Sequence, residues 1–186
     1  MPLAINEMQT SVGELQRDYL HKLEVEAYPA SMNAAFAGSP MVSKAVDLYL
    51  SKGVFPNRKT NPIQVKWAGE TFYHSGPDES TKTADLTFRV DESMKIRDFW
   101  EAAKDLTGNI TNHAAVNKPM QTLTLGVYLI NVGKNTVTDY RRLHNVLVYS
   151  VDGITPDKEA SGIQTFTVNI SWDYQTQDKT KRGLSI

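Results

Sequence analysis

The segment GIQTFTVNISWDYQ, residues 162–175, alternates apolar and polar side chains along almost its whole length. A period of two residues is typical of a β-strand that buries one face. The side chains predicted to share the buried face are Phe166, Val168, Ile170, Trp172 and Tyr174. The open face carries Thr165, Thr167, Asn169 and Ser171. Exposed sheets usually carry charged side chains that stop them from pairing with a neighbour, so this small, uncharged face indicates a special environment.

Further alternating segments predict that most of the chain is β-structure. Residues 19–28 alternate apolar with charged side chains, as a strand with one solvated face does. Residues 62–74, PIQVKWAGETFYH, predict a hairpin that reverses at Ala68-Gly69-Glu70. The remaining predicted strands are residues 84–90, 123–132, 134–143 and 144–154.

Two segments carry helical spacing. Residues 93–108 predict a helix, with Ser93 or Asp91 placed to cap its start and Gly108 placed to end it. Its apolar positions are Ile96, Phe99, Trp100, Ala103 and Leu106, of which we expect Phe99 and Trp100 to be core residues. Residues 41–55 fit both helical and strand spacing, and the chain-breaking residues Gly53 and Pro56 favour a strand.

About seven to nine strands with one helix between two groups of strands predict a mainly β protein, an antiparallel β-sandwich or barrel with one flanking α-helix. The 186 residues are enough for a single domain, 1–186, with a buried core. Within it we expect an N-terminal arm at 1–16, a long loop or extended region at 29–62, and a mobile C-terminal tail at 176–186.

The composition excludes several classes of function. The 20 Lys and Arg residues against 21 Asp and Glu residues give a net charge of −1, so the broad positive field of a tight nucleic-acid binder is missing. The absence of cysteine excludes disulfides and thiolate metal sites. No secretory signal pattern or apolar run of membrane-spanning length is present, so we expect no membrane insertion by this chain.

The motifs of common catalytic sites are also missing. The histidines, at positions 21, 74, 113 and 144, are scattered singly and lack metal-ligand spacing. No nucleophile elbow, phosphate-binding loop or dinucleotide fingerprint is present. Glu24 and Glu26 are interpreted as a solvated strand face rather than an acid–base pair. We therefore expect no enzyme activity, no catalytic residue, no cofactor and no metal.

Three stretches of this sequence resemble the tail tube proteins of contractile-tailed bacteriophages. RDYLHKLEVEAY resembles the first long strand of that family, and ADLTFRVDESMKIRDFWEAA resembles its strand followed by an aromatic-bearing helix. SVDGITPDKEASGIQTFTVNISWDY resembles its closing hairpin. The chain departs from the family pattern in the short loop between Pro156 and Ile163, and in having Gln175 where a tryptophan commonly follows Asp-Tyr.

The resemblance implies a structural role. Subunits of that family join into six-fold rings whose strands form a ring-shaped β-barrel, and the rings stack into the tube through which DNA leaves the capsid. The implied partners are further copies of the chain, the tail sheath protein, the tape-measure protein, baseplate or initiator proteins, and DNA in transient, non-specific passage. The implied location is the tail of a virion assembled in the host cytoplasm. On this reading the open face of the last long strand lines the channel, at a sheet edge that a neighbouring subunit completes.

Alternative functions remain open from the sequence. The type VI secretion tube protein is similar in architecture, so an injection-system tube protein, a tube initiator or a baseplate protein of the same fold is one alternative. A small-ligand-binding β-sandwich, with aromatic side chains lining a cleft, is another. An enzyme without a recognisable motif is the third.

Overall fold

The computed structural model describes residues 19–29, 32, 46–47, 49–90, 92–107, 122–131, 134–154 and 164–185. These residues contain nine strands, the helix α4 and the short 3-10 helix η2. The strands are β1 (Tyr19–Ala27), β2 (Leu50–Lys52), β3 (Thr60–Trp67), β4 (Glu70–Asp78), β5 (Thr83–Arg89), β6 (Leu123–Asn131), β7 (Thr136–Val151), β8 (Thr165–Ser171) and β9 (Tyr174–Gln177). The helices whose bounds lie within the described residues are α4 (Lys95–Thr107) and η2 (Lys179–Lys181). The predicted 1–16 arm lies outside the described residues.

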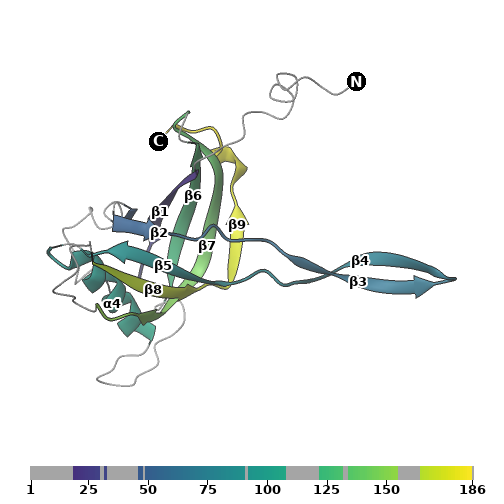
Figure 1. The fold of residues 1–186 in the computed structure, drawn as a ribbon, viewed down its shortest axis with the longest axis horizontal. Coiled ribbons are helices and arrows are strands. Elements are labelled where there is room, and N and C mark those ends of the chain that lie inside the picture. The colour runs from purple at the N-terminus through teal and green to yellow at the C-terminus, as the bar shows by residue number, and fades with distance from the viewer. Residues whose placement is uncertain are drawn as a thin grey trace.

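Seven strands form one antiparallel sheet that curls into a half-barrel, with α4 packed against it (Figure 1). Their order is β1-β6-β7-β8-β5-β2. The seventh strand, β9, pairs with the part of β7 that precedes the residues paired with β8. The predicted fold class is confirmed, including the flanking helix. The joining of subunits into a ring-shaped barrel stays a prediction.

The sheet bends where β7 changes partners. The first part of β7 pairs with β6 and β9, whereas its last residues pair with β8. Asn145 lies at the change, with a positive φ of 54°, and its side-chain amide donates to Asp173 Oδ2 at 2.9 Å. The prediction of two strands over 134–143 and 144–154 is wrong, because the irregularity at Asn145 shifts the alternation of β7 without ending the strand.

The core lies between the two halves of the bent sheet and α4. Aromatic rings form its centre, with ring centroids 5.3 Å apart for Phe88 and Trp100 and 5.6 Å apart for Phe88 and Phe166. The residues selected from the sequence as core candidates, Phe99, Trp100, Phe166, Val168, Ile170 and Trp172, are all buried. These aromatic side chains therefore fill the interior rather than line an open cleft. The expectation that Tyr174 shares their buried face is wrong, because the strand β8 ends at Ser171 and Tyr174 begins β9 with 51% of its surface exposed.

Strand β8 is an interior strand. It pairs with β7 on one side and with β5 on the other. The expectation that it lies at an edge is therefore wrong. A small polar face does not require an edge when the neighbouring strand continues the same kind of face.

The described residues of the predicted long loop or extended region at 29–62 include β2 and the first residues of β3. Among the described residues of 41–55, the preference for a strand holds for Leu50–Lys52. Val46, Asp47 and Tyr49 are helical, in keeping with the three- and four-residue spacing of the apolar side chains. Asp47 Oδ1 accepts the backbone N–H of Leu23 at 2.8 Å. This contact satisfies a donor on the edge of β1 that faces away from β6.

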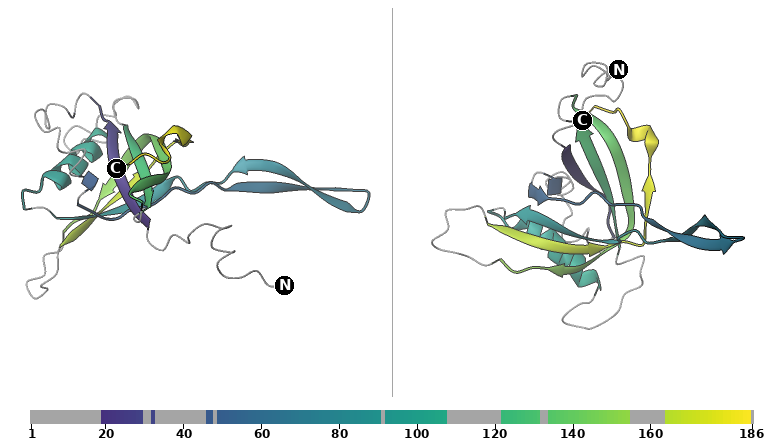
Figure 2. Two further views of the ribbon diagram at one scale, coloured as in Figure 1. Left: turned by 90° about the horizontal axis from the view of Figure 1, so that it is seen from above. Right: turned by 45° about the vertical axis from the view of Figure 1, so that its right-hand side comes forward.

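Strands β3 and β4 leave the body of the molecule as a long two-stranded arm, which the views in Figures 1 and 2 show from several sides. We use "arm" for residues 60–78. It forms a sheet of its own, separate from the seven-stranded sheet. The predicted hairpin is confirmed, but its projection from the body was not foreseen.

Candidate assembly surfaces

The arm has one apolar face and one polar face. Directly opposed residues of an antiparallel pair share a face, and the register pairs Val65 with Phe72 and Ile63 with His74. Trp67 lies on the same side, opposite Glu70. The exposed fractions of the four apolar side chains are Ile63 51%, Val65 42%, Trp67 75% and Phe72 47%. An apolar stripe is therefore open to solvent in the single subunit.

The opposite face of the arm carries Gln64, Lys66, Thr71 and Tyr73. The two strands reverse through Ala68 and Gly69, whose φ angles are 49° and 85°. Two successive positive φ values define the tight turn that matches the natural twist of a two-stranded ribbon. The amphipathic character of the arm therefore follows directly from the hairpin register.

The root of the arm is held by a dense set of hydrogen bonds. The backbone N–H groups of Lys59 and Glu79 donate to Ser80 Oγ at 2.9 Å and to the Lys59 carbonyl at 2.8 Å, respectively. The Asn61 amide donates to Glu79 Oε1 at 2.8 Å. The side chain of Gln175, on β9, reaches the carbonyl of Asn57 at 2.6 Å. These bonds join the two strands of the root to each other, and the bond of Gln175 ties the root to β9 of the body.

The candidate lumen residues share a face with β5. The register opposes Ser171 with Thr83, Asn169 with Asp85, Thr167 with Thr87, and Thr165 with Arg89. Thr165 is exposed, and Thr167, Asn169 and Ser171 are partly exposed. The surface is therefore a small polar face two strands wide that also contains one carboxylate and one guanidinium, which the last strand alone did not reveal.

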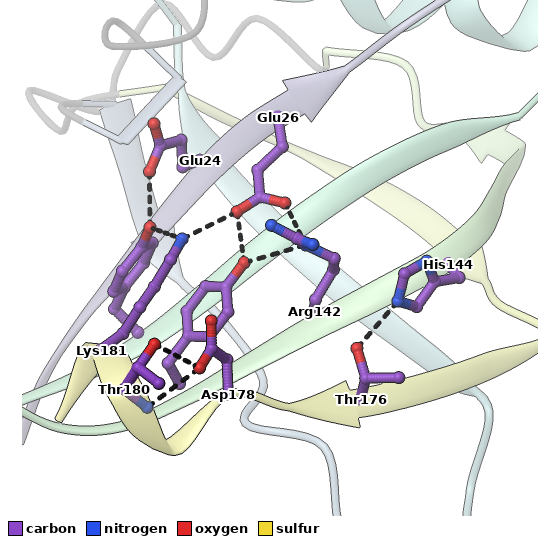
Figure 3. A network of polar contacts seen from close by, with 10 residues as sticks. Glu24, Glu26, Arg142, His144, Thr176, Asp178, Thr180 and Lys181 are labelled. Carbon is purple, nitrogen blue, oxygen red and sulfur yellow. Dashed lines mark hydrogen bonds and ion pairs between the residues drawn. The ribbon is translucent and has the colours of Figure 1, made fainter.

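A third surface lies on the outer face of β1, β6 and β7, where the C-terminal segment crosses the sheet (Figure 3). Glu26 is its centre and accepts hydrogen bonds from the Tyr140 hydroxyl and from Arg142 Nε. Lys181 Nζ lies 3.1 Å from Glu26 Oε1 and 3.1 Å from the Tyr128 hydroxyl. The Tyr128 hydroxyl donates in turn to Glu24 Oε2 at 2.8 Å. The side chain of Glu26 is only 15% exposed.

These contacts set the charges of the network. Burial alone would raise the pKa of Glu26, but hydrogen bonds from Tyr140, Arg142 and Lys181 outweigh burial and lower that pKa below its usual value. Burial, together with the hydrogen bond to Glu24, raises the pKa of Tyr128 to about 12. The pKa of Lys181 is raised, because its hydrogen bonds to Tyr128 and Glu26 overcome burial. The carboxylate and the ammonium are therefore both charged at neutral pH.

A second anchor of the C-terminal segment is Asp139 on β7. Its Oδ1 accepts from Gln177 Nε2 at 2.8 Å and from Arg182 Nη2 at 2.9 Å, and its Oδ2 lies 3.3 Å from Arg141 Nη2. Backbone hydrogen bonds join Gly183 to Val137 at 2.8 Å and Val137 to Leu184 at 3.0 Å. Residues 176–185, predicted as a tail, therefore follow the body closely, while mobility itself stays a prediction.

The sequence does not indicate this network. The interpretation of Glu24 and Glu26 as a solvated strand face is wrong for Glu26, because side chains more than one hundred residues away cover it. His144 has no predicted role, and the structure stacks this ring on Tyr174 at 4.4 Å and places its Nε2 2.8 Å from Thr176 Oγ1. Burial lowers the pKa of His144. No local pattern could have indicated either set of contacts.

The described part of the chain shows no site for metal chemistry. Within it, no group of three or more His, Asp or Glu side chains is arranged to hold a metal ion. Among the same residues, no helix is both long enough and apolar enough to cross a membrane.

Three solved assemblies contain chains with a similar fold. A chain in the PVC sheath/tube terminator of an extracellular contractile injection system, in its extended state, is 11% identical, with a TM-score of 0.54 over 89% of this chain and 96% of that one. A chain in the extended PVC sheath-tube complex is 11% identical, with a TM-score of 0.50 over 95% and 99%. A chain in the baseplate of the anti-feeding prophage is 9% identical, with a TM-score of 0.51 over 90% and 97%.

These similarities concern the fold. No protein-family model and no curated protein matches the sequence. At identities near 11% the shared feature is the arrangement of strands and helix over nearly the full length of each chain. The chain therefore has the tail-tube-like fold that its sequence resemblance predicted.

Proposed function

We propose that this protein is a structural subunit of a tube, built from stacked six-membered rings, in the tail of a contractile-tailed bacteriophage. The fold supports the tube role, since chains of similar fold occur in sheath-tube, terminator and baseplate assemblies. In this proposal its partners are further copies, the sheath, the tape-measure protein and baseplate proteins, and the tube belongs to a virion assembled in the host cytoplasm.

The observation that carries the proposal is the arm. A folded chain rarely leaves a contiguous stripe of large apolar side chains in water, and such a stripe marks an interaction surface. Ile63, Val65, Trp67 and Phe72 form such a stripe, on a ribbon whose root is fixed by hydrogen bonds. Because the two strands of the arm are already paired and its root is bonded to β9, docking the arm orders few further residues and costs little conformational entropy.

The proposed partner of the arm is a second copy of this chain. Every copy carries the same arm, so an assembly of one repeating subunit must cover every arm with the same surface of a neighbour. An arm that docks on a different surface of the next copy makes a head-to-tail contact, which generates rings when it closes and filaments when it does not. Rings that stack into a tube need such contacts.

A matched pair of substitutions tests the arm. Val65→Asp places a carboxylate on the apolar face, and Gln64→Asp places the same charge one residue away on the polar face. Both variants should fold, because the arm lies outside the core, and only Val65→Asp should prevent the formation of rings or tubes seen by negative-stain microscopy. Equal assembly of the two variants would contradict the proposal.

The proposal also assigns the two-strand polar face, with Thr165, Thr167, Asn169 and Ser171, to the channel wall. A translocating polyanion slides most easily past small neutral groups, whereas repeated lysines would hold phosphates through counterion release. Thr167→Lys should leave assembly intact and slow DNA delivery, with partial recovery at raised salt. Thr138→Lys, at an exposed position on the other half of the sheet, is the control and should deliver DNA normally. A delivery defect in the control alone would move the channel to that half.

The nature of the particle can be tested separately. A phage tail delivers DNA, whereas an injection particle of the same architecture carries no packaged genome. Purified particles that contain this chain should therefore hold nuclease-protected DNA in an attached capsid. Particles with tubes but without protected DNA would retain the tube role and exclude the phage assignment.

A further inference from the structure

The C-terminal residues 178–185, which we call the strap, lie on the outer face of β1, β6 and β7. Polar contacts dominate their attachment: Lys181 with Glu26 and Tyr128, and Arg182 with Asp139. Backbone bonds between the strap and Val137 add a short antiparallel contact near the end of the chain. We infer that the strap is an ionic clasp that detaches from the body as a unit while the core remains folded.

The strap contributes almost nothing to the apolar core. Its helix η2 has no buried residue, and the side chain of Leu184 is 53% exposed. The principal core cluster contains no residue of the strap and lies on the opposite side of the sheet. Because burial of apolar surface supplies most of the folding free energy, detachment of the strap leaves the main source of stability untouched.

The body also keeps its charges paired when the strap leaves. Glu26 retains hydrogen bonds from Tyr140 and Arg142, and Asp139 retains Arg141 at 3.3 Å. A buried carboxylate without a partner would oppose detachment strongly, and neither carboxylate is left in that state. Release therefore costs the contacts of the strap and the cover that Lys181 gives to the rings of Tyr128 and Tyr140, and it leaves no carboxylate unpaired.

Lys181 is the main anchor of the strap. Its ammonium meets the Glu26 carboxylate and the Tyr128 hydroxyl and lies 4.0 Å from the centre of the Tyr140 ring. The side chain is 26% exposed, so its charge is only partly screened by water. Tyr128 and Tyr140 form a small buried cluster with Ile130 and Val137, and their rings lose the ammonium that lies over them when Lys181 leaves. The strap thus controls access to an aromatic surface edged by Glu24 and Glu26.

Amide hydrogen exchange tests this inference in the full-length chain. The reporters are the N–H groups of Gly183 and Val137, which form the backbone bonds between strap and body. The references are the N–H groups of β8, which lie in the core sheet. Lys181→Met removes the charge but keeps a side chain of similar length, and Lys179→Met is the matched control at an exposed position two residues earlier.

Lys181→Met should accelerate exchange at both reporters by about tenfold or more, as the loss of a hydrogen bond to a charged group predicts. Exchange in β8 and the thermal midpoint should be unchanged, and Lys179→Met should match the unmodified chain. Raising the salt to about 1 M, where charges are screened within about 3 Å, should accelerate the reporters of the unmodified chain in the same way. Reporters that exchange only together with β8, or equal rates in the two lysine variants, would overturn the inference. It goes beyond the tube role and does not depend on it.

Discussion

The arm and the strap differ in which kind of side chain they expose to solvent. The arm carries large apolar side chains and leaves them in solvent, with Trp67 75% exposed. The strap carries lysine and arginine and places them against the body, with Lys181 26% exposed. Each segment thus reverses the usual relation between polarity and burial.

The difference indicates where each segment finds its partner. The strap has its partners within the same chain, in Glu26 and Asp139, so its contacts are complete in a single subunit. In the described part of the chain, nothing covers the apolar face of the arm, and the proposed function assigns its partner to a second copy of the chain. In that proposal, exposed apolar surface marks the contact between subunits, whereas paired charge marks a contact within one subunit.

The largest expected effect is the difference in the free energy of unfolding when phenylalanine is replaced by alanine in the core and in the arm. Phe88 is completely buried, and Phe88→Ala should lower the free energy of unfolding by about 3–5 kcal/mol. Phe72 is 47% exposed, and Phe72→Ala should change it by less than about 0.5 kcal/mol. Urea denaturation of the dispersed subunit measures both values. A cost for Phe72→Ala near that for Phe88→Ala would show that the arm packs on the body.

The second prediction concerns the direction of the arm. A Cβ added at Gly76 would collide with the backbone carbonyl oxygen of Asn61 on the facing strand. Gly76→Ala should therefore distort the pairing near the root of the arm and reduce tube formation, with little change in the thermal midpoint. Gly153→Ala, where an added Cβ meets nothing within 4 Å, is the control. Normal tubes from Gly76→Ala would show that assembly tolerates an arm in another direction.

The third prediction concerns acid release of the strap. The pKa of Glu26 in the folded chain lies below its usual value of 4.5, so the stability that it contributes is complete above that value and is lost as the pH falls through the folded pKa. Asp139, whose pKa is also lowered by Gln177 and Arg182 against the effect of burial, acts in the same direction. Exchange at Gly183, corrected for the intrinsic pH dependence, should therefore accelerate below about pH 4.5.

Glu26→Gln provides the control for this pH dependence. The charged and polar groups that face Glu26 are Arg142 and Tyr140 on β7 and Lys181 on the strap, and Glu24 is linked to them through Tyr128. The variant should show faster exchange at neutral pH and a smaller further increase in acid. An acid response as large as that of the unmodified chain would assign the effect to another group.

The smallest expected effect lies at the tip of the arm. Ala68 has a φ of 49°, a conformation that costs a residue with a Cβ roughly 1–2 kcal/mol, while glycine adopts it freely. After the larger unfolded-state entropy of glycine is subtracted, Ala68→Gly should stabilise the arm by about 1 kcal/mol or less. Amide exchange over residues 63–73 measures this gain. The thermal midpoint of the body should not move, and a clear shift would mean that the arm and the core unfold together.

The sequence by itself determined the elements and the core. The two-residue period of 165–172 and the three- and four-residue spacing of 95–107 are local properties, and they predict β8, α4 and the buried aromatic residues. The Ala68-Gly69 reversal predicts the hairpin for the same reason. The resemblance to tail tube proteins rests on the order of these elements, and the fold bears it out.

Only the tertiary structure decided how the segments meet. Lys181 and Glu26 are separated by 155 positions, and no local period connects them. The bend at Asn145 brings β9 onto β7, and this pairing carries the strap across the outer face of the sheet. The direction of the arm depends likewise on contacts such as that of Gln175 with Asn57, 118 positions apart. Periodicity indicates which side chains of a segment lie on its buried face. The partner of each side chain depends instead on which distant segments the folded chain brings together.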